Sequence, residues 1–142
     1  MYGMKKFFTL AAFVFAVMLS SSALAATWTE IHTSDTNVKV YIDKSSIKRG
    51  VHCAALGVDR SDGFSANIKL EFVISDKETL AMINTMGFFE ENGLKKKCYI
   101  SEIDENGNPV QNSSFKPEVS PADGSDGRIW PEVYEYIQKN LP

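Results

Sequence analysis

The chain has 142 residues, with 15 lysines and arginines against 18 aspartates and glutamates, and 44% of its residues are hydrophobic. Both lysines of the first 26 residues precede an apolar run, so the rest of the chain carries a net charge of about −5. An acidic domain attracts neither nucleic acid nor an anionic membrane surface, and we expect no nucleic-acid partner.

The first 26 residues have the pattern of a secretory signal peptide. Two lysines stand before the apolar residues 7–19, and small residues then lead to an alanine-leucine-alanine sequence that ends at Ala25. The apolar run has about 13 residues, whereas a helix that spans a bilayer needs roughly 20. We therefore expect residues 1–26 to be removed by cleavage after Ala25 or Ala26. Residues 27–142 would then form a single exported domain, periplasmic or extracellular, without stable insertion in a membrane.

Two cysteines follow the leader, Cys53 and Cys98, in a domain of about 116 residues. Neither is the first residue after the cleavage site, so attachment to a lipid at that position is not expected. Two cysteines in an oxidising compartment usually pair, and a Cys53–Cys98 disulfide would close a loop of about 45 residues. The chain-entropy model gives such a loop roughly 4 kcal/mol of stabilisation. A reactive thiol is the alternative use of either cysteine.

The first elements after the leader have the pattern of a β-hairpin. Residues 27–33 favour a strand and residues 34–37 a turn. Residues 38–42 alternate between apolar and polar side chains, which is typical of a half-buried strand. Aspartate and serine side chains bond nearby backbone groups, so we expect residues 43–46 to end this strand. Ile47 would then return to the core as a single apolar anchor.

The spacing of the apolar residues changes in the middle of the chain. Residues 51–59 are expected to form a third strand, and residues 66–74 form a fourth with one apolar and one polar face, as in an antiparallel sheet that is wet on one side. Residues 75–78 then match a helix-capping box, and apolar residues follow at helical spacing. These apolar residues are Leu80, Ile83 and Met86. We expect a middle helix here that ends near Gly87 or Gly93.

The last third of the chain is expected to add a hairpin and a helix. Residues 94–103 and 110–115 would be its two strands around an asparagine-glycine turn at 104–109, and residues 116–126 would be a surface loop. Pro131 suits the first turn of a helix because its missing N–H costs nothing there. One stripe of this helix is apolar and comprises Trp130, Val133 and Ile137, with Tyr134 and Leu141 beside it. These elements predict an α+β fold, in which an antiparallel sheet of about five or six strands has a middle helix and a C-terminal helix packed on it.

The sequence lacks the usual catalytic and metal-binding patterns. His32 and His52 have neither H-x-x-x-H nor H-E-x-x-H spacing, and no C-x-x-C motif occurs, so we expect no metal site and no cofactor. A cysteine–histidine hydrolase needs a thiolate beside an imidazole. His52 does not readily serve Cys53, because neighbouring residues of a strand point to opposite faces. His32 reaching Cys53 or Cys98 is the arrangement that stays open.

Lys95, Lys96 and Lys97 form a basic run in an otherwise acidic domain. Three lysines focus positive potential and could contact an acidic segment of a partner. The tyrosine-rich C-terminal segment around Tyr134 is a second candidate contact. The alternative is that the lysines protect a strand edge against aggregation.

Two segments of the domain carry a resemblance to a known family. Trp28 stands near the expected mature start, and the sequence Tyr-Ile-Asp-Lys-Ser-Ser-Ile follows at 41–47. This arrangement resembles the opening of the bacterial surface-adhesin protein E family, and the Lys-Cys pair at 97–98 and the turn at 104–107 fit its later parts. The resemblance implies an antiparallel sheet with a helix packed on it, displayed at the cell envelope, and binding of host extracellular-matrix or plasma proteins by some members. This chain departs from the family in lacking a lipid-attachment cysteine and in having Cys53 instead of a second cysteine near the C-terminus.

The sequence therefore predicts an exported, non-enzymatic domain that binds another protein or is associated with the cell envelope. Adhesin-like recognition of a protein partner is the form that the resemblance implies. One alternative is a small periplasmic hydrolase that uses Cys53 or Cys98 with a histidine. Another is an inhibitor of a secreted enzyme, such as a lysozyme or a protease, whose sheet a disulfide would also stabilise.

Thiol titration of the native protein separates the binding domain from the hydrolase. We expect no free thiol in the folded, exported protein and two after reduction, because a disulfide consumes both cysteines. A free thiol in the native protein would contradict the pairing and keep the cysteine–histidine mechanism open.

Overall fold

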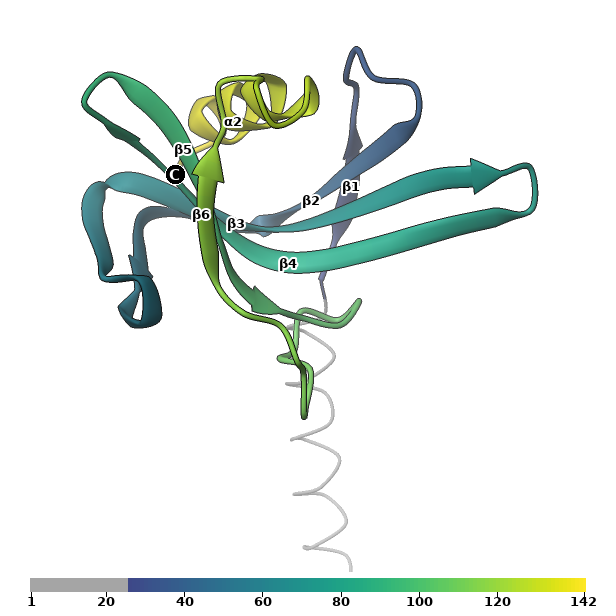
Figure 1. The fold of residues 1–142 in the computed structure, drawn as a ribbon, viewed down its shortest axis with the longest axis horizontal. Coiled ribbons are helices and arrows are strands. Elements are labelled where there is room, and N and C mark those ends of the chain that lie inside the picture. Colours follow the sequence, from purple (N-terminus) through teal and green to yellow (C-terminus); the bar gives the residue numbers. More distant parts are fainter. Residues whose placement is uncertain (1–25) are drawn as a thin grey trace, which may run out of the picture.

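The structure, a computed structural model, describes residues 26–142, which form one six-stranded antiparallel sheet and one α-helix (Figure 1). The strands lie side by side in chain order, so each neighbouring pair is joined by a direct connection. The strands are β1 (Trp28–Ile31), β2 (Val38–Cys53), β3 (Val58–Ser75), β4 (Glu78–Glu91), β5 (Leu94–Glu102) and β6 (Glu118–Pro121), and the helices are the 3-10 turn η1 (Ala54–Leu56) and α2 (Ile129–Lys139).

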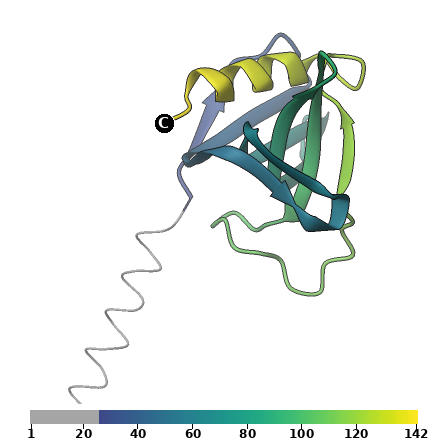
Figure 2. The ribbon, with the colours of Figure 1, turned by 90° about the vertical axis from the view of Figure 1, so that its left-hand side faces the viewer.

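Helix α2 packs on one side of the sheet and confirms the predicted C-terminal helix. Figure 2 shows the sheet curling toward α2, and we name the side that faces the helix the concave face. Because side chains alternate along a strand, the even-numbered residues of β3 and β4 point to this face. They pack against the apolar stripe of the helix in the main core, which includes Val40, Ile42, Ala66, Ile68, Leu70, Met86, Phe88, Trp130, Val133 and Ile137. Tyr134 closes this core, with its ring centre 4.9 Å from that of Phe64.

A smaller core lies on the opposite, convex face. The register shifts between Arg49 and Val51, and Gly50 has a φ of +88°, which lets the end of β2 bend across the sheet. Val51 then packs with Phe89 of β4 and Cys98 of β5, and all three are buried. Both faces of the sheet are therefore covered at this end.

The N-terminal hairpin is also confirmed. β1 and β2 pair antiparallel, and Ile31, Val40 and Ile42 are buried. The leader predicted for residues 1–26 falls almost entirely outside the described residues. In the described part of the chain, no helix has the length and apolar character needed to cross a membrane.

The predicted middle helix is wrong, because residues 75–91 form the turn and the second strand of a β-hairpin. Asp76 and Lys77 make the turn, and the Lys77 N–H donates to Ser75 Oγ at 3.3 Å. The serine that suggested a helix cap therefore stabilises a turn. Residues 79–89 contain three β-branched and two aromatic side chains, which favour a strand, and pairing with β3 decides the outcome.

A bulge replaces the predicted end of the first long strand. Asp43 Oδ1 accepts hydrogen bonds from the Ser45 N–H at 3.1 Å and hydroxyl at 2.6 Å. Ser46 Oγ donates to the Asp43 carbonyl at 2.6 Å. These are the local bonds that predicted a stop, but the register only shifts here and β2 continues. The third strand predicted at 51–59 is divided by η1 between β2 and β3.

The return strand predicted at 110–115 is not formed, and β6 lies inside the loop predicted at 116–126. Ile103 and Pro109 make only an isolated bridge. Residues 111 and 112 form a turn in which Asn112 has a φ of +57°, so the segment leaves the extended conformation that a strand requires. β6 pairs with β5 instead over four residues.

Gly87 of β4 is the tightest point of the smaller core. A Cβ atom there would lie 2.0 Å from Val51 Cγ2 and 2.8 Å from Cys98 Sγ. We therefore expect Gly87→Ala to lower the free energy of unfolding, measured in urea, by about 2 to 3 kcal/mol through overpacking. In a Val51→Ala background, which makes room, the same change should cost less than about 1 kcal/mol. An equal loss in both backgrounds would contradict the packing of β2 across β4.

Candidate functional site

Helix α2 leaves one end of the concave face uncovered. Along β3, the exposed fraction rises from 1% at Ile68 and 5% at Leu70 to 62% at Ile74. On β4, Leu80 is 55% and Met82 is 42% exposed. The helix therefore covers only part of the sheet, and the tip of the β3–β4 hairpin extends past it (Figure 1).

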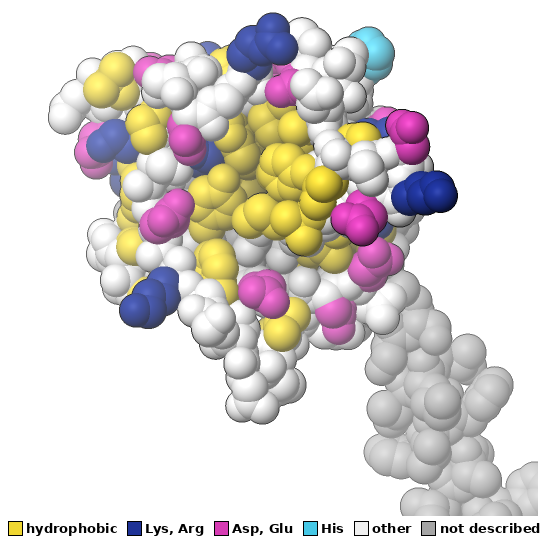
Figure 3. All heavy atoms as spheres, turned by 45° about the vertical axis from the view of Figure 1, so that its right-hand side comes forward, with side chains coloured by type: hydrophobic (Ala, Val, Ile, Leu, Met, Phe, Trp, Pro, Cys, Tyr) yellow, Lys and Arg dark blue, Asp and Glu magenta, His cyan; other side chains and the backbone are white. Residues whose placement is uncertain are grey.

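We define the apolar hollow as the surface made by Phe72, Leu80 and Met82; the exposed Ile74 lies beyond it on β3, at the register shift between Val73 and Ser75. The register places Phe72 opposite Leu80 and Leu70 opposite Met82, so these side chains are neighbours on one face. Figure 3 shows hydrophobic side chains gathered in a depression at the centre of this side of the molecule. Exposed apolar side chains that lie together on a protein surface often mark a contact site.

Acidic side chains frame the hollow. Glu78 lies on the same face of β4 as Leu80. Glu102 of β5 lies opposite Asn84, which is a concave-face residue of β4. Glu118 of β6 stands opposite Tyr99. Figure 3 shows acidic side chains along the lower and right-hand margins of the apolar surface. The hairpin turn contributes one lysine beyond them, so the negative potential is strongest along the strands.

The outer edge of β4 is unpaired beside the hollow. β5 pairs with β4 from Asn84 onward, and the Ile103 N–H donates to the Ile83 carbonyl at 3.1 Å. Backbone groups alternate in direction along a strand, so those of Thr79 and Ala81 point to the same side as those of Ile83. Within the described residues, no backbone hydrogen bond reaches Thr79 or Ala81 from that side, and both residues are exposed.

A pocket of about 330 Å³ opens at this edge. It is lined by residues 81–84 of β4 and by Glu102, Ile103 and Phe115. The unpaired backbone of β4, the apolar side chains of Met82 and Phe115, and the Glu102 carboxylate therefore all border this pocket. This combination can accept an extended chain with an apolar or a basic side chain.

Two of the four residues predicted to contact a partner are not at the surface. Lys97 is 0% exposed and Tyr134 is 3% exposed. Lys95 and Lys96 are accessible: Lys95 Nζ lies 5.0 Å from the centre of the Tyr134 ring. Lys96 Nζ is 2.9 Å from Glu91 Oε1. Lys97 and Tyr134 therefore cannot be the predicted contacts.

The buried Lys97 ammonium holds together the elements that border the hollow. It donates to Ser120 Oγ at 2.6 Å and to the Pro121 carbonyl at 3.0 Å, both on β6. It also donates to the Asp126 carboxylate and lies 4.8 Å from the centre of the Trp130 ring. One cation of β5 thus fastens β6, the following loop and the start of α2.

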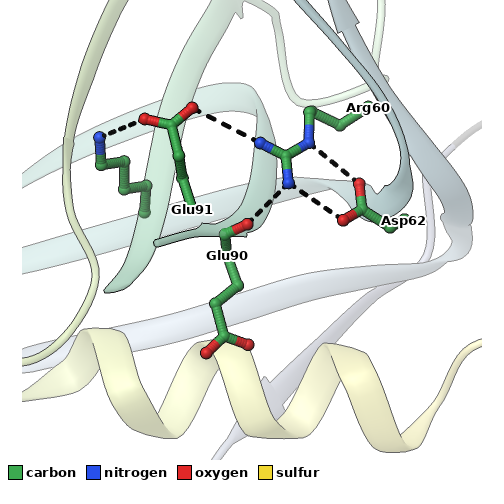
Figure 4. A network of polar contacts seen from close by, with 5 residues as sticks. Arg60, Asp62, Glu90 and Glu91 are labelled. Atoms are coloured by element: carbon green, nitrogen blue, oxygen red, sulfur yellow. Dashed lines mark hydrogen bonds and ion pairs between the residues drawn. The ribbon is translucent and has the colours of Figure 1, made fainter. Parts of the chain in front are cut away.

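A second polar network, at the end of the sheet away from the hollow, joins β3, β4 and β5 (Figure 4). Arg60 Nε and Nη2 each donate to Asp62 at 3.1 Å, and Nη2 also donates to the Glu90 carbonyl at 2.8 Å. Glu91 lies 3.5 Å from Arg60 and 2.9 Å from Lys96. The hydrogen bond from Arg60 lowers the pKa of Asp62, and the one from Lys96 lowers the pKa of Glu91. Two cations and two carboxylates neutralise one another, so this network is structural.

A pocket of about 440 Å³ lies beside this network, with Lys48, Arg49, His52, Arg60 and Ser65 among its lining residues. The Ser65 hydroxyl is buried and has no hydrogen-bond partner among the described residues. Both arginines are already engaged, Arg60 as above and Arg49 Nε with the Pro142 carbonyl at 2.9 Å. Both guanidinium groups that line the pocket therefore already have partners.

Both cysteines are free thiols in the structure, and both are buried. Burial raises the pKa of Cys98 to about 11, and the charge of Cys53 adds to that rise. A buried thiol of this pKa is protonated at neutral pH and is a poor nucleophile. The structure does not contain the disulfide predicted from the sequence, so the pairing of Cys53 with Cys98 stays a prediction.

The histidines lie at the surface. His32 follows β1, and His52 Nδ1 is 3.6 Å from Asp59 Oδ1, with both side chains mostly exposed. Over residues 26–142, no group of three or more histidine, cysteine, aspartate or glutamate side chains is placed to hold a metal ion.

Trp28, Tyr41 and the turn at 104–107, which belong to the family resemblance, meet on the convex face. Trp28 Nε1 donates to the Glu105 carbonyl at 2.8 Å, in the turn at 104–107. Lys69 Nζ lies 5.9 Å from the centre of the Trp28 ring and 5.1 Å from that of Tyr41. It also lies 3.3 Å from Glu105 Oε1. These segments are distant in sequence and support one another structurally.

Comparison of the chain with protein-family models, with curated protein sequences and with solved structures gives no match. The candidate site therefore rests on the geometry of the apolar hollow and the β4 edge.

The sequence pattern marks Ile74 and the residues of the hollow as apolar, but it predicts that they are buried in the core. Ile74 was expected on the buried face of a strand, and Leu80 on the buried side of a helix. The signal that could have located the hairpin is the alternation of Leu80 and Met82, which continues that of β3 across a two-residue turn. Their exposure has no local signal, because it depends on where α2 ends.

The Lys97 network predicts a specific loss of stability. Asp126→Ala leaves the buried ammonium without its counter-ion and should lower the free energy of unfolding by about 2 kcal/mol in urea denaturation. Asp123→Ala is the matched control, because Asp123 is exposed and bonds only to Ser125, and it should cost about 0.5 kcal/mol or less. Equal effects of the two changes would contradict the role given to Lys97.

Proposed function

We propose that the chain is an exported, non-enzymatic domain that binds another protein through the apolar hollow. The observation that carries the proposal is the exposure of Leu80 and Met82 on one face of β4, with the exposed Ile74 at the register shift near the hairpin tip. Apolar side chains clustered inside a polar rim are typical of protein–protein contacts. Export by the leader at residues 1–26 is part of the same proposal and places the partner in the periplasm or outside the cell.

The charge of the chain indicates the chemistry of the partner. The domain after the leader carries a net charge of about −5, and Glu78, Glu102 and Glu118 frame the hollow. Complementary charge accelerates association and disfavours acidic competitors. The expected partner therefore presents apolar side chains flanked by lysine or arginine.

The hydrolase alternative lacks an activated nucleophile among the described residues. Cys98 is fully enclosed, and burial raises its pKa to about 11. Cys53 is buried as well. A thiol that is enclosed and protonated at neutral pH does not attack a substrate, which supports a binding role.

Inhibition of a secreted enzyme is a second candidate, favoured by the shape of the β3–β4 hairpin. Its tip extends past the rest of the sheet, and its turn consists of Asp76 and Lys77 alone (Figure 1). A projecting hairpin of this kind fits the concave cleft of an enzyme, with the apolar hollow against the cleft's rim. The identity of the captured partner separates the two candidates.

Photo-crosslinking in the producing cells tests the proposed function. The photoreactive residue p-benzoylphenylalanine replaces Leu80 in the hollow or, as control, Lys39, which is exposed on the convex face. We expect one predominant adduct with an envelope or extracellular protein from position 80 and none from position 39. A Met82→Lys change in the position-80 variant should reduce that adduct about tenfold, because it places a charge in the hollow.

The cross-linking result is interpreted together with a control for folding. The thermal unfolding of each variant shows that the fold is retained. Absence of a position-80 adduct from cell envelope, periplasm and medium, with the fold intact, would contradict a contact through the hollow.

A further inference from the structure

The geometry points to a specific mode of binding: an extended segment of the partner pairs antiparallel with the outer edge of β4 along residues 79–82. This segment would continue the line of β5, which ends opposite Asn84. Its apolar side chains would occupy the hollow, and its basic side chains would face outward. The inference rests on the proposed protein-binding function and defines the kind of partner.

The open part of β4 is an unprotected edge of the described sheet. β1 and β6 are the outermost strands, and each has only four residues. β6 is also flanked by Pro117 and ends at Pro121, and prolines block pairing with another strand. Residues 79–82 read Thr-Leu-Ala-Met, without a charge or a proline. An edge of this composition is a template for strand addition.

The pleat of β4 fixes which side chains of an added strand enter the hollow. Ala81 directs its N–H and carbonyl outward, and its side chain lies on the convex face. Leu80 and Met82 direct their side chains to the concave face. Opposite residues of an antiparallel pair share a face, so partner residues opposite Leu80 and Met82 fill the hollow. The partner residue between them hydrogen-bonds to Ala81.

Carboxylates at both ends of the open edge favour a basic segment. Glu78 stands at the tip end of the open edge and Glu102 at the pocket end. On the convex face, Glu71 lies opposite Ala81 in the neighbouring strand, and it is already paired with Lys69 at 3.6 Å. An added strand with apolar residues opposite Leu80 and Met82 meets apolar side chains on the concave face, and the net charge of about −5 of the domain favours basic residues in the rest of that strand.

A second copy of this chain fits the same edge less well. Two copies would bring together two domains that each carry a net charge of about −5 and would place acidic margins against each other. A partner of opposite charge gains attraction where a second copy meets repulsion.

A defined peptide tests strand addition. The probe is Lys-Val-Lys-Val-Lys-Val-Lys with blocked ends, titrated into the exported protein and followed by the NMR amide signals of β4. N-methylation of the inner lysines removes the N–H groups that face β4 and should weaken binding at least about tenfold. N-methylation of the valines, whose N–H groups point to solvent, should weaken it less than about threefold. The analogue with glutamate for lysine should bind at least about tenfold more weakly.

Variants of the protein give the matching result. Ala81→Pro removes the outward N–H at an edge position that tolerates proline and should abolish binding of the peptide while the unfolding transition persists. If that variant does not fold, the two methylated peptides still decide the question with the unaltered protein. Equal effects of both methylation patterns, or pairing of two protein copies that the peptide does not displace, would overturn the inference. Loss of peptide binding together with a retained cross-link from position 80 would overturn strand addition and leave the proposed function standing.

Discussion

The surface of this protein is set by a mismatch in length between its strands and its helix. β3 has 18 residues and β4 has 14, which correspond to about 59 Å and 46 Å at about 3.3 Å per residue. Helix α2 has 11 residues, about 16 Å at 1.5 Å per residue, so it covers only part of the concave face. At one end the sheet covers itself, with Val51 packed against Cys98. At the other end the β3–β4 hairpin stays open.

The closed and the open regions differ in what stabilises them. The helix is fixed by burial of Trp130 and by the Lys97 ammonium, which binds β6 and the Asp126 carboxylate at the same time. At the open end, Leu80 and Met82 remain in contact with water, which costs roughly 25 cal/mol for each Å² of apolar surface. A partner that covers them recovers this free energy and also pairs the free backbone groups of β4. The proposed function and the proposed mode of binding are thus two consequences of the same uncovered area.

The sequence predicts the parts of the fold whose signals are local. Alternation identified the apolar face of β3, and the apolar stripe around Trp130 identified α2. Residues 75–78 carry a local pattern that serves a helix cap and a hairpin turn equally, and the long-range pairing with β3 selects the turn. Lys97 reads as a surface residue of a basic run, because its counter-ion Asp126 is 29 residues away. The hollow could not be predicted, since exposure depends on the relative lengths of elements that are far apart in the chain.

Amide hydrogen exchange at single-residue resolution tests most directly whether the hollow and the β4 edge are a contact surface left open by the fold. In the free protein, we expect fast exchange at Thr79 and Ala81, because their N–H groups are unpaired. We expect slow exchange at Leu80 and Met82, whose N–H groups point toward β3. In the complex with the cross-linked partner, exchange at Thr79 and Ala81 should become slow. Slow exchange at Ala81 in the free monomer, or unchanged exchange in the complex, would show that the β4 edge is not an open contact surface.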